Sequence, residues 1–316
     1  MPPPHPQPTV THTHLSLFDP RALVLALQEG SLEHVQLQKG LFMGEIAHSQ
    51  SSQCRTDWGH YNLALLCQGN LSPGWITIGI SLHGDGPWHV QGEKHCNGDI
   101  ILYTAGSEMC ISLPPNAQWL CIQVPRQRLD MLGLRLPPNT SVLHLPGRLT
   151  PETAIMLRRL AAVLGPQREH SPHAALSEQM HEDLLQIIWP ELARRWRLPT
   201  RSTVTRRHSR QVLLQSVRHW CEEQGDSPLR MDVLCQELDL PIWQLERTFR
   251  QSYGVPPQRL LTLHRLAKAR CDLLSTHERV TQIAMANGFW HLGRFAQLYK
   301  DYFCESPSET ARMHRQ

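Results

Sequence analysis

Hydrophobic positions in the last third of the chain repeat at an interval of about fifty residues. Positions i, i+3 and i+7 lie on one face of a helix. Each copy ends in an aromatic residue and a turn, at 253–257 and at 303–307. The pattern therefore predicts, twice, a short helix, a turn and a longer helix with one buried stripe, which is a tandem pair of helix-turn-helix units. The matched residues are Val233, Leu234, Ile242, Leu245 and Phe249 in the first copy, and Ile283, Ala284, Leu292, Phe295 and Tyr299 in the second.

A different pattern covers residues 37–124. Short segments rich in β-branched and aromatic residues, at 75–80, 99–103 and 119–124, alternate with Gly, Pro and Asn turns. Strands at such close spacing predict a small antiparallel sandwich or barrel.

Helical periodicity follows at Thr150, a suitable N-cap with Pro151 in the first helical position. A second helix is expected over 174–196, where Pro190 would bend or divide it. We therefore expect an α+β chain with a disordered Pro-rich tail over 1–20, a first domain over 21–197, a linker over 198–211 and an all-α domain over 212–316.

The distribution of charge, the cysteines and the apolar runs limit the possible functions of the chain. Residues 201–316 hold 17 Lys and Arg against 12 Asp and Glu, whereas the rest of the chain holds 14 against 16. The basic part is thus the part with the repeat, as a phosphate-binding surface requires. Nine cysteines without a C-x-x-C pair indicate reduced thiols in a cytoplasmic protein, and no apolar run is long enough for a membrane span.

The outer faces of the two longer helices carry the candidate DNA contacts. A helix in the major groove needs donors and acceptors for base edges, flanked by cations for phosphates. Taken singly, each of these residues is more often a solvated helix residue, and Trp243 could equally close the core of the turn. The candidate base contacts are Trp243, Gln244, Glu246, Arg247, His291, Arg294 and Gln297, and the candidate backbone contacts are Arg250 and Lys300.

The segment 258–274 predicts a helix between the two units. At about 1.5 Å per residue it spans roughly 25 Å. It can therefore set the two DNA-binding helices about one DNA turn, ~34 Å, apart, so that one monomer contacts two adjacent major-groove segments.

Residues 212–316 resemble the C-terminal domain of the AraC/XylS family of bacterial transcription regulators. The motifs that carry the resemblance lie at 265–270 (RLAKAR), 280–284 (VTQIA), 288–295 (GFWHLGRF) and 306–308 (SPS). The resemblance implies seven helices and activation through contact with RNA polymerase. The GFWHLG form is similar to the branch that holds the ethanolamine-utilisation and toluate/benzoate regulators, although no residue here identifies either kind of effector.

Two positions depart from the family pattern. Pro241 stands where the family often has a Ser helix cap, which predicts a slightly different entry angle for the first DNA-binding helix. Cys304 replaces a common Gly and would strain a left-handed backbone.

The N-terminal half resembles, more weakly, the cupin-like β-barrel that serves the same family for effector binding, followed by dimerisation helices. The segments 98–103 and 113–119 carry this resemblance. We expect the effector pocket among Trp75, Trp88, Tyr103 and Trp119, although Trp in a small barrel is more often plain core.

Four polar residues, His83, His89, Glu93 and His95, have the composition of a cupin metal site. Their spacing is loose, which favours surface or turn histidines, so we expect no metal and no cofactor. The chain also lacks a P-loop, a GxGxxG and a Ser-His-Asp order, so we expect no enzyme.

Together these patterns predict a sequence-specific transcription regulator. It would act as an activator and a homodimer, with double-stranded promoter DNA, RNA polymerase and an unknown small-molecule effector as partners and no membrane. Two alternatives stay open: a regulator controlled by a protein partner, and a metal-dependent cupin enzyme fused to a DNA-binding domain.

Overall fold

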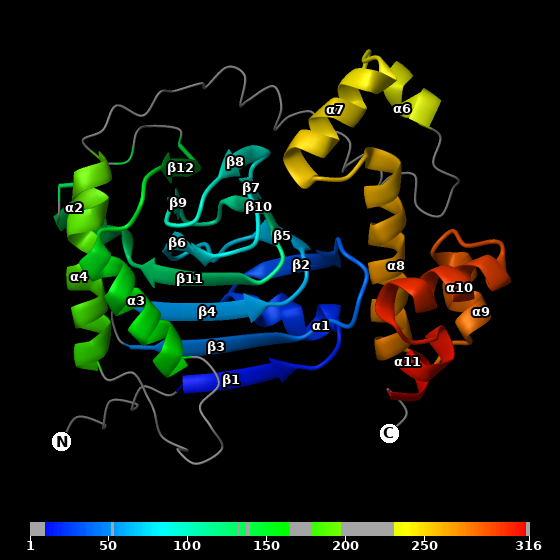
Figure 1. Ribbon diagram of the computed structural model, residues 1–316, viewed down its shortest axis with the longest axis horizontal. Helices are drawn as coiled ribbons and strands as arrows, with labels where there is room; N and C mark the ends of the chain where they lie inside the picture. Colours follow the sequence, from blue (N-terminus) through cyan, green and yellow to red (C-terminus); the bar gives the residue numbers. More distant parts are fainter. Residues whose placement is uncertain are drawn as a thin grey trace.

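The computed structural model describes residues 10–51, 54–131, 133–134, 136, 140–164, 178–196 and 231–313. Two β-sheets form the N-terminal half, and helices form the C-terminal half (Figure 1). The chain is therefore α+β, as the sequence predicts. The expected linker, 198–211, lies outside the described residues.

Every strand pair in the two sheets is antiparallel. The larger sheet has seven strands in the order β1-β3-β4-β11-β6-β9-β12, and the smaller has five in the order β2-β5-β10-β7-β8. The larger sheet consists of β1 (Val10–Leu15), β3 (Gly44–Gln50), β4 (Arg55–Tyr61), β6 (Ile76–His83), β9 (Ile100–Tyr103), β11 (Ala117–Val124) and β12 (Val142–Leu145). The smaller consists of β2 (Ser31–Gln36), β5 (Leu65–Asn70), β7 (Trp88–Val90), β8 (Glu93–His95) and β10 (Glu108–Leu113).

The two sheets do not close into a barrel, which corrects the expectation of a closed cupin-like barrel. No strand pair recorded among the described residues joins one sheet to the other, so each sheet keeps two edges. An exposed edge offers unpaired N–H and C=O groups to other chains. Here β7 and β8 are only 3 residues long, and a helix of the C-terminal half packs against the edge strand β2. In the smaller sheet, a short strand protects one edge and helix α8 (Pro257–Ser275) covers the other.

The beginning of the chain also differs from expectation. Strand β1 pairs with β3 from Val10 to Leu15, inside the segment expected to be a disordered tail. Helix α1 (Pro20–Leu23) and the 3-10 turn η1 (Val24–Ala26) follow. Thr13 is half-buried and Leu15 is buried, whereas His14 between them is exposed, an alternation with a period of two that suits an edge strand.

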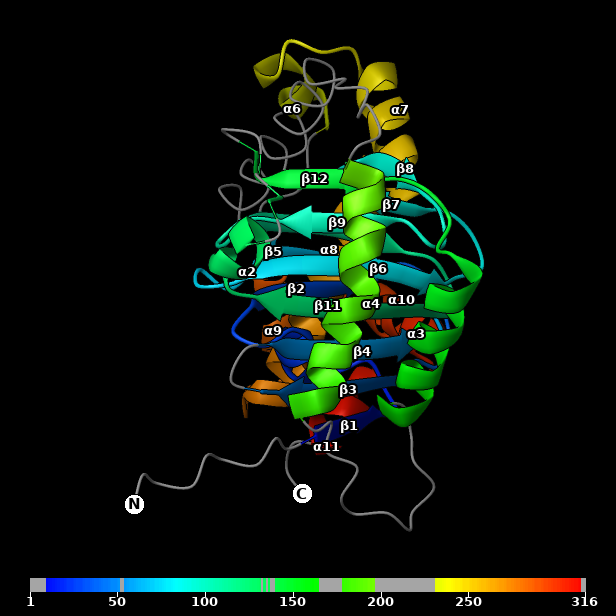
Figure 2. The same ribbon diagram turned by 90° about the vertical axis from the view of Figure 1, so that its left-hand side faces the viewer.

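Helices cover the outer face of the larger sheet (Figure 2). They are α2 (Arg126–Met131), α3 (Pro151–Leu164) and α4 (Glu178–Trp196). Apolar residues of α3 and α4, among them Leu157, Leu185 and Ile188, pack with Ile78, Leu120 and other sheet residues in one buried cluster. Pro190 lies inside α4 and does not divide it.

The C-terminal helices repeat in length and in their caps. Both α7 and α10 have 12 residues, and both α6 and α9 have 7. Gly254 after α7 and Cys304 after α10 both adopt the left-handed conformation, with φ 74° and 61°. The strained cap expected at Cys304 is therefore confirmed. The helices are α6 (Met231–Glu237), α7 (Ile242–Tyr253), α8 (Pro257–Ser275), α9 (Val280–Ala286), α10 (Leu292–Phe303) and α11 (Pro307–Met313).

The core between the sheets continues into the C-terminal half. The Phe18 and Phe303 rings stack with centroids 5.9 Å apart, and buried residues of both halves form one cluster. Arg270 of α8 is buried there, where its guanidinium pairs with Glu305 at 2.6 Å and donates to the Phe18 carbonyl oxygen. None of the helices in the described part of the chain is both long and apolar enough to cross a bilayer.

Candidate functional site

The outer faces of α7 and α10 carry the residues predicted to contact DNA. Arg247 and Arg250 are exposed on α7, and Gln297 and Lys300 are exposed at the equivalent places on α10. The buried faces hold Leu245 and Phe249 in α7 and Phe295 and Tyr299 in α10. The other candidate base contacts are exposed or partly exposed: Trp243, Gln244, Glu246, His291 and Arg294.

Two residues of the expected buried stripe are exposed instead. Ile242 keeps 51% of its surface in solvent and Leu292 keeps 39%. Each is the first residue of its helix. The regular spacing of the stripe therefore does not ensure burial in the first turn of either helix.

These two residues each lie beside an exposed tryptophan. Trp243 is 61% exposed at the start of α7, and Trp290, just before α10, is 57% exposed. The exposure of Trp243 excludes the alternative that it closes the core of the turn. The sequence analysis does not predict Trp290 as a contact. Its position next to His291, a predicted contact, could have indicated it.

Two of the candidate DNA contacts, Arg250 and Gln297, each interact with an acidic side chain of their own helix. The Glu246 carboxylate lies 3.7 Å from the Arg250 guanidinium. The Gln297 side-chain amide donates to the Asp301 carboxylate at 2.6 Å. Both acids are one helical turn from their partner, so each pair can exchange its internal bond for one to DNA by a rotamer change.

Helix α8 separates the two surfaces. Its 19 residues give a length of about 28 Å at the usual helical rise. Helix α7 lies at one end of α8, and α9, α10 and α11 gather toward the other (Figure 1). The helix thus has the length and position expected for a spacer.

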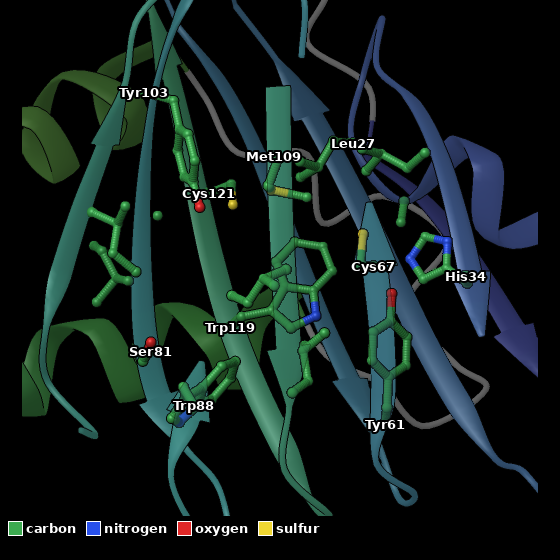
Figure 3. Close-up of a pocket in the computed structure, with 17 residues that line it drawn as sticks. Leu27, His34, Tyr61, Cys67, Ser81, Trp88, Tyr103, Met109, Trp119 and Cys121 are labelled. Atoms are coloured by element: carbon green, nitrogen blue, oxygen red, sulfur yellow. The ribbon is translucent and has the colours of Figure 1, made fainter. Parts of the chain in front are cut away.

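A cavity of about 50 Å³ lies between the two sheets (Figure 3). Roughly 10–15 Å³ of such space holds one water molecule, so the cavity has room for a few heavy atoms. Trp88, Tyr103 and Trp119, three of the four predicted pocket residues, line it together with His34, Tyr61 and Met109.

Trp75 does not line the cavity, contrary to the sequence expectation. The Arg55 guanidinium lies over its ring, 4.4 Å from the centroid. Trp75 immediately precedes β6, outside the regular alternation of that strand. An aromatic residue at a strand end can therefore serve a surface contact rather than the interior.

The cavity wall carries no charge. Its lining contains no Asp, Glu, Lys or Arg, and burial lowers the pKa of its one histidine, His34, to about 3, so this ring is neutral near pH 7. The Tyr103 hydroxyl is buried and has no hydrogen-bond partner among the described residues. A buried hydroxyl without a hydrogen-bond partner lowers the stability of the fold by about 1–3 kcal/mol until a partner bonds to it.

Strand β2 links the cavity to the C-terminal helices. His34 and Gln36 are two residues apart, so their side chains lie on the same face of the strand. His34 lines the cavity, while the Gln36 carbonyl oxygen accepts from the Tyr302 hydroxyl of α10 at 3.0 Å. Nearby, Arg21 of α1 donates to the Leu274 carbonyl oxygen of α8.

The four residues weighed as a metal site do not form one cluster. Only His95 belongs to a group whose ligand atoms lie within 4.8 Å of one another in the described part of the chain, and its companions are Asp99 and His144. The His83 side chain is 57% exposed and faces Asp85. Spacing along the chain could not find His144 as a companion, because the pairing of β12 with β9 brings it beside Asp99.

The sequence is similar to known regulators over two different spans. A helix-turn-helix domain family model matches residues 234–313. The probable thc operon regulatory protein of Rhodococcus erythropolis is 38% identical over 96 residues, which make up 29% of this chain and 29% of that protein. The transcriptional activator RhaS of Enterobacter sp. (strain 638) is 28% identical over 238 residues, 73% of this chain and 80% of that protein.

The helix-turn-helix match and the similarity to RhaS support the AraC/XylS family for this chain. With the thc regulator, the match spans less than a third of that protein's length. Among solved structures, the AraC-like transcriptional activator CuxR has 15% identity and a TM-score of 0.41, with 84% of this chain and 96% of that chain covered.

The family motifs have definite structural roles here. Ala284 is fully buried in α9 and Gly288 has φ 76°, a conformation that suits glycine in the turn before α10. The Asn287 side-chain amide donates to Asp272 of α8 at 2.8 Å and thereby ties this turn to the spacer helix. The motif thus positions the start of α10.

Proposed function

We propose that this protein is a sequence-specific transcription regulator that binds promoter DNA through α7 and α10 as two helix-turn-helix units. The single observation that carries the proposal is the pair of matched helices. They share length, buried stripe and left-handed cap, and both expose polar side chains next to a basic residue. We assign 212–316 to DNA binding, 198–211 to a linker and 21–197 to effector binding and dimerisation.

In this proposal the two helices enter successive major grooves. Arg247 and Gln297 contact base edges, together with the other polar candidates, and Arg250 and Lys300 contact phosphates. Ile242 and Leu292, exposed at the helix starts, suit the methyl groups of thymine. Trp243 would contact base edges beside them, and Trp290 would pack against the sugar–phosphate backbone.

We further propose that the effector is small and electrically neutral. A carboxylate or an ammonium group would lose its hydration in the cavity without meeting a counter-charge, which costs several kcal/mol. A neutral molecule with one hydrogen-bonding oxygen could instead bond to the Tyr103 hydroxyl. The charge-free lining thus disfavours both an aromatic acid and a protonated amine.

The effector would act through β2. A molecule against His34 would move the strand whose next inward residue, Gln36, bonds to α10. Such a ligand shifts the balance between docked and released C-terminal helices only if it binds one state more tightly. We propose that the protein is an activator, and that a homodimer recruits RNA polymerase at the promoter.

Footprinting tests the DNA proposal. Sites are first selected from random duplexes with the purified full chain, and hydroxyl-radical protection is then mapped on the selected DNA. Two protected segments on one face, about ten base pairs apart, are expected for each protomer. A single protected segment per protomer would contradict the two-unit arrangement, and failure to enrich any sequence would contradict specific binding.

Thermal shift tests the effector proposal. Neutral and charged molecules of similar size and only a few heavy atoms, such as propan-1-ol, propylamine and propionate, are compared at pH 7. A ligand that binds only the folded state raises the melting temperature, and only neutral members of each set should do so. Stabilisation by charged members alone would refute the neutral-ligand assignment, and a response to none would favour control by a protein partner.

A further inference from the structure

Two histidines and one aspartate that neither line the cavity nor belong to α7 or α10 form a cluster of their own. His95 ends β8, Asp99 precedes β9, and His144 lies in β12. His95 and Asp99 are 2% and 5% exposed, whereas the His144 side chain keeps 17% of its surface in solvent. The cluster is thus buried with one accessible side.

The three ligand atoms have the separation that a small metal ion requires. The Asp99 Oδ2 atom lies 3.1 Å from the His144 Nε2 atom and 3.8 Å from the His95 Nδ1 atom, and all three lie within 4.8 Å of one another. In a tetrahedral zinc site with bonds of 2.0–2.1 Å, ligand atoms are about 3.3 Å apart. Small side-chain rotations would bring the cluster to that geometry.

We propose that His95, Asp99 and His144 bind a zinc-like divalent transition-metal ion. Two imidazoles and one carboxylate favour zinc or a neighbouring transition metal over magnesium or calcium, which prefer oxygen ligands. Three protein ligands leave a fourth position for water or a further donor, toward the accessible side of His144.

The backbone holds the carboxylate ready for this role. The N–H groups of Cys96 and Gly147 each donate to one Asp99 oxygen at 2.9 Å. A carboxylate whose oxygens are fixed by backbone hydrogen bonds suits a metal ligand.

Arg195 of α4 supports the two segments that supply the ligands. Its buried guanidinium donates to the carbonyl oxygens of Gly98 and Leu145, at 2.9 Å and 3.0 Å. These residues adjoin Asp99 and His144 in the sequence. The Glu191 carboxylate, 3.4 Å from Arg195, offsets its positive charge, so this cation does not stand unbalanced beside the ion.

The cluster adjoins the first DNA-binding helix. Helix α7 packs against β7 and β8, and His95 is the last residue of β8. If the proposed function holds, metal binding would bias the position of α7. The metal site itself does not depend on that function.

Metal titration of the untagged full chain tests the proposal. After chelator dialysis, zinc affinity is measured by competition with a chromogenic chelator, and the cobalt(II) form is examined by absorption. We expect one ion per chain, and visible bands of a tetrahedral site without a thiolate charge-transfer band. His144→Gln and Asp99→Asn should each weaken zinc binding by at least about tenfold, whereas His83→Gln, at an exposed histidine, should not.

Zinc should also raise the melting temperature of the wild type but not of His144→Gln. Equal affinity in wild type and both cluster variants would overturn the site, as would a thiolate spectrum or the absence of binding. In each of those cases the His144–Asp99 contact would be only a hydrogen bond between β12 and the residue before β9. If Asp99→Asn fails to fold, the cobalt spectrum of the wild type and the His144→Gln titration still decide.

Discussion

Tyr302 and Gln36 form a reciprocal pair of hydrogen bonds between the two halves of the molecule. The Tyr302 hydroxyl donates to the Gln36 carbonyl oxygen at 3.0 Å, and the Gln36 side-chain amide donates to the Tyr302 carbonyl oxygen at 3.4 Å. The Gly40 amide donates to the same carbonyl at 3.1 Å. The pair joins β2, which lines the cavity, to α10, the second helix proposed to bind DNA.

The first prediction concerns this pair. Tyr302→Phe removes the hydroxyl and leaves the Gln36 carbonyl with one bond fewer, so the free energy of unfolding should fall by about 0.5–1.5 kcal/mol. The Gly40 amide should also exchange its hydrogen faster. Tyr299→Phe is the matched control, because that hydroxyl bonds to Arg270 and Thr310 within the C-terminal helices. Faster Gly40 exchange in the control but not in Tyr302→Phe would contradict the assignment.

His34 predicts a pH dependence of stability. Burial lowers its pKa from 6.5 to about 3 in the folded chain. Between these values the unfolded chain binds a proton that the folded chain does not. The free energy of unfolding should therefore fall as the pH drops from about 6.5 towards 3, by up to about 1.4 kcal/mol per pH unit from this residue.

Denaturant unfolding between pH 7.5 and pH 5 measures this slope. His34→Gln should reduce it, whatever its effect on stability at neutral pH. His83→Gln, at a side chain that is 57% exposed, should leave the slope nearly unchanged. An unaltered slope in His34→Gln would show that other groups cause the dependence.

The two helix caps predict opposite effects of reciprocal substitutions. A non-glycine residue pays about 1–2 kcal/mol for the left-handed conformation that Cys304 adopts. Part of the gain from glycine is lost to its greater freedom in the unfolded chain. Cys304→Gly should therefore raise the free energy of unfolding by up to about 1 kcal/mol. Gly254→Cys should lower the free energy of unfolding by about 1 kcal/mol. No atom beyond the chain neighbours lies within 4 Å of an added Cβ, so the left-handed backbone alone opposes this substitution. Changes of the same sign would exclude backbone strain as the cause.

The sequence predicts most of the C-terminal half because its signals are local. Leu245 and Phe249 are buried as the helical spacing requires, and Cys304 takes the conformation expected of its glycine counterpart. The predicted burial of Ile242 is wrong because burial depends on which neighbours reach the first turn of the helix. The periodicity of the sequence does not encode those neighbours.

The N-terminal half is less predictable because its contacts are distant in sequence. Whether two sheets close into a barrel depends on hydrogen bonds between edge strands, and no local pattern marks an edge. The cluster around Asp99 also depends on a contact that is distant in sequence. The pairing of His144 in β12 with Ile101 in β9 brings His144 beside Asp99. A search restricted to 83–95 cannot find it.

Tyr103 predicts a separation of stability from ligand binding. Its hydroxyl is buried without a partner, so Tyr103→Phe should leave the stability of the ligand-free protein unchanged or slightly higher. Tyr299→Phe, which loses two hydrogen bonds, should be less stable. With a neutral effector found by thermal shift, Tyr103→Phe should show a smaller shift than the wild type. A marked loss of stability in the free Tyr103→Phe protein would show that the hydroxyl already has a partner.

The DNA-binding faces proposed for α7 and α10 predict two classes of substitution. Arg247→Ala and Gln297→Ala should each cost about 1–3 kcal/mol on the selected site and little on random DNA, because base contacts discriminate between sequences. Arg250→Ala and Lys300→Ala should weaken both kinds of binding and reduce the salt dependence, since each removes a phosphate contact. Affinities measured by fluorescence anisotropy over a range of salt concentrations separate the two classes. Equal losses on selected and random DNA for Arg247→Ala and Gln297→Ala would place these residues on the backbone instead.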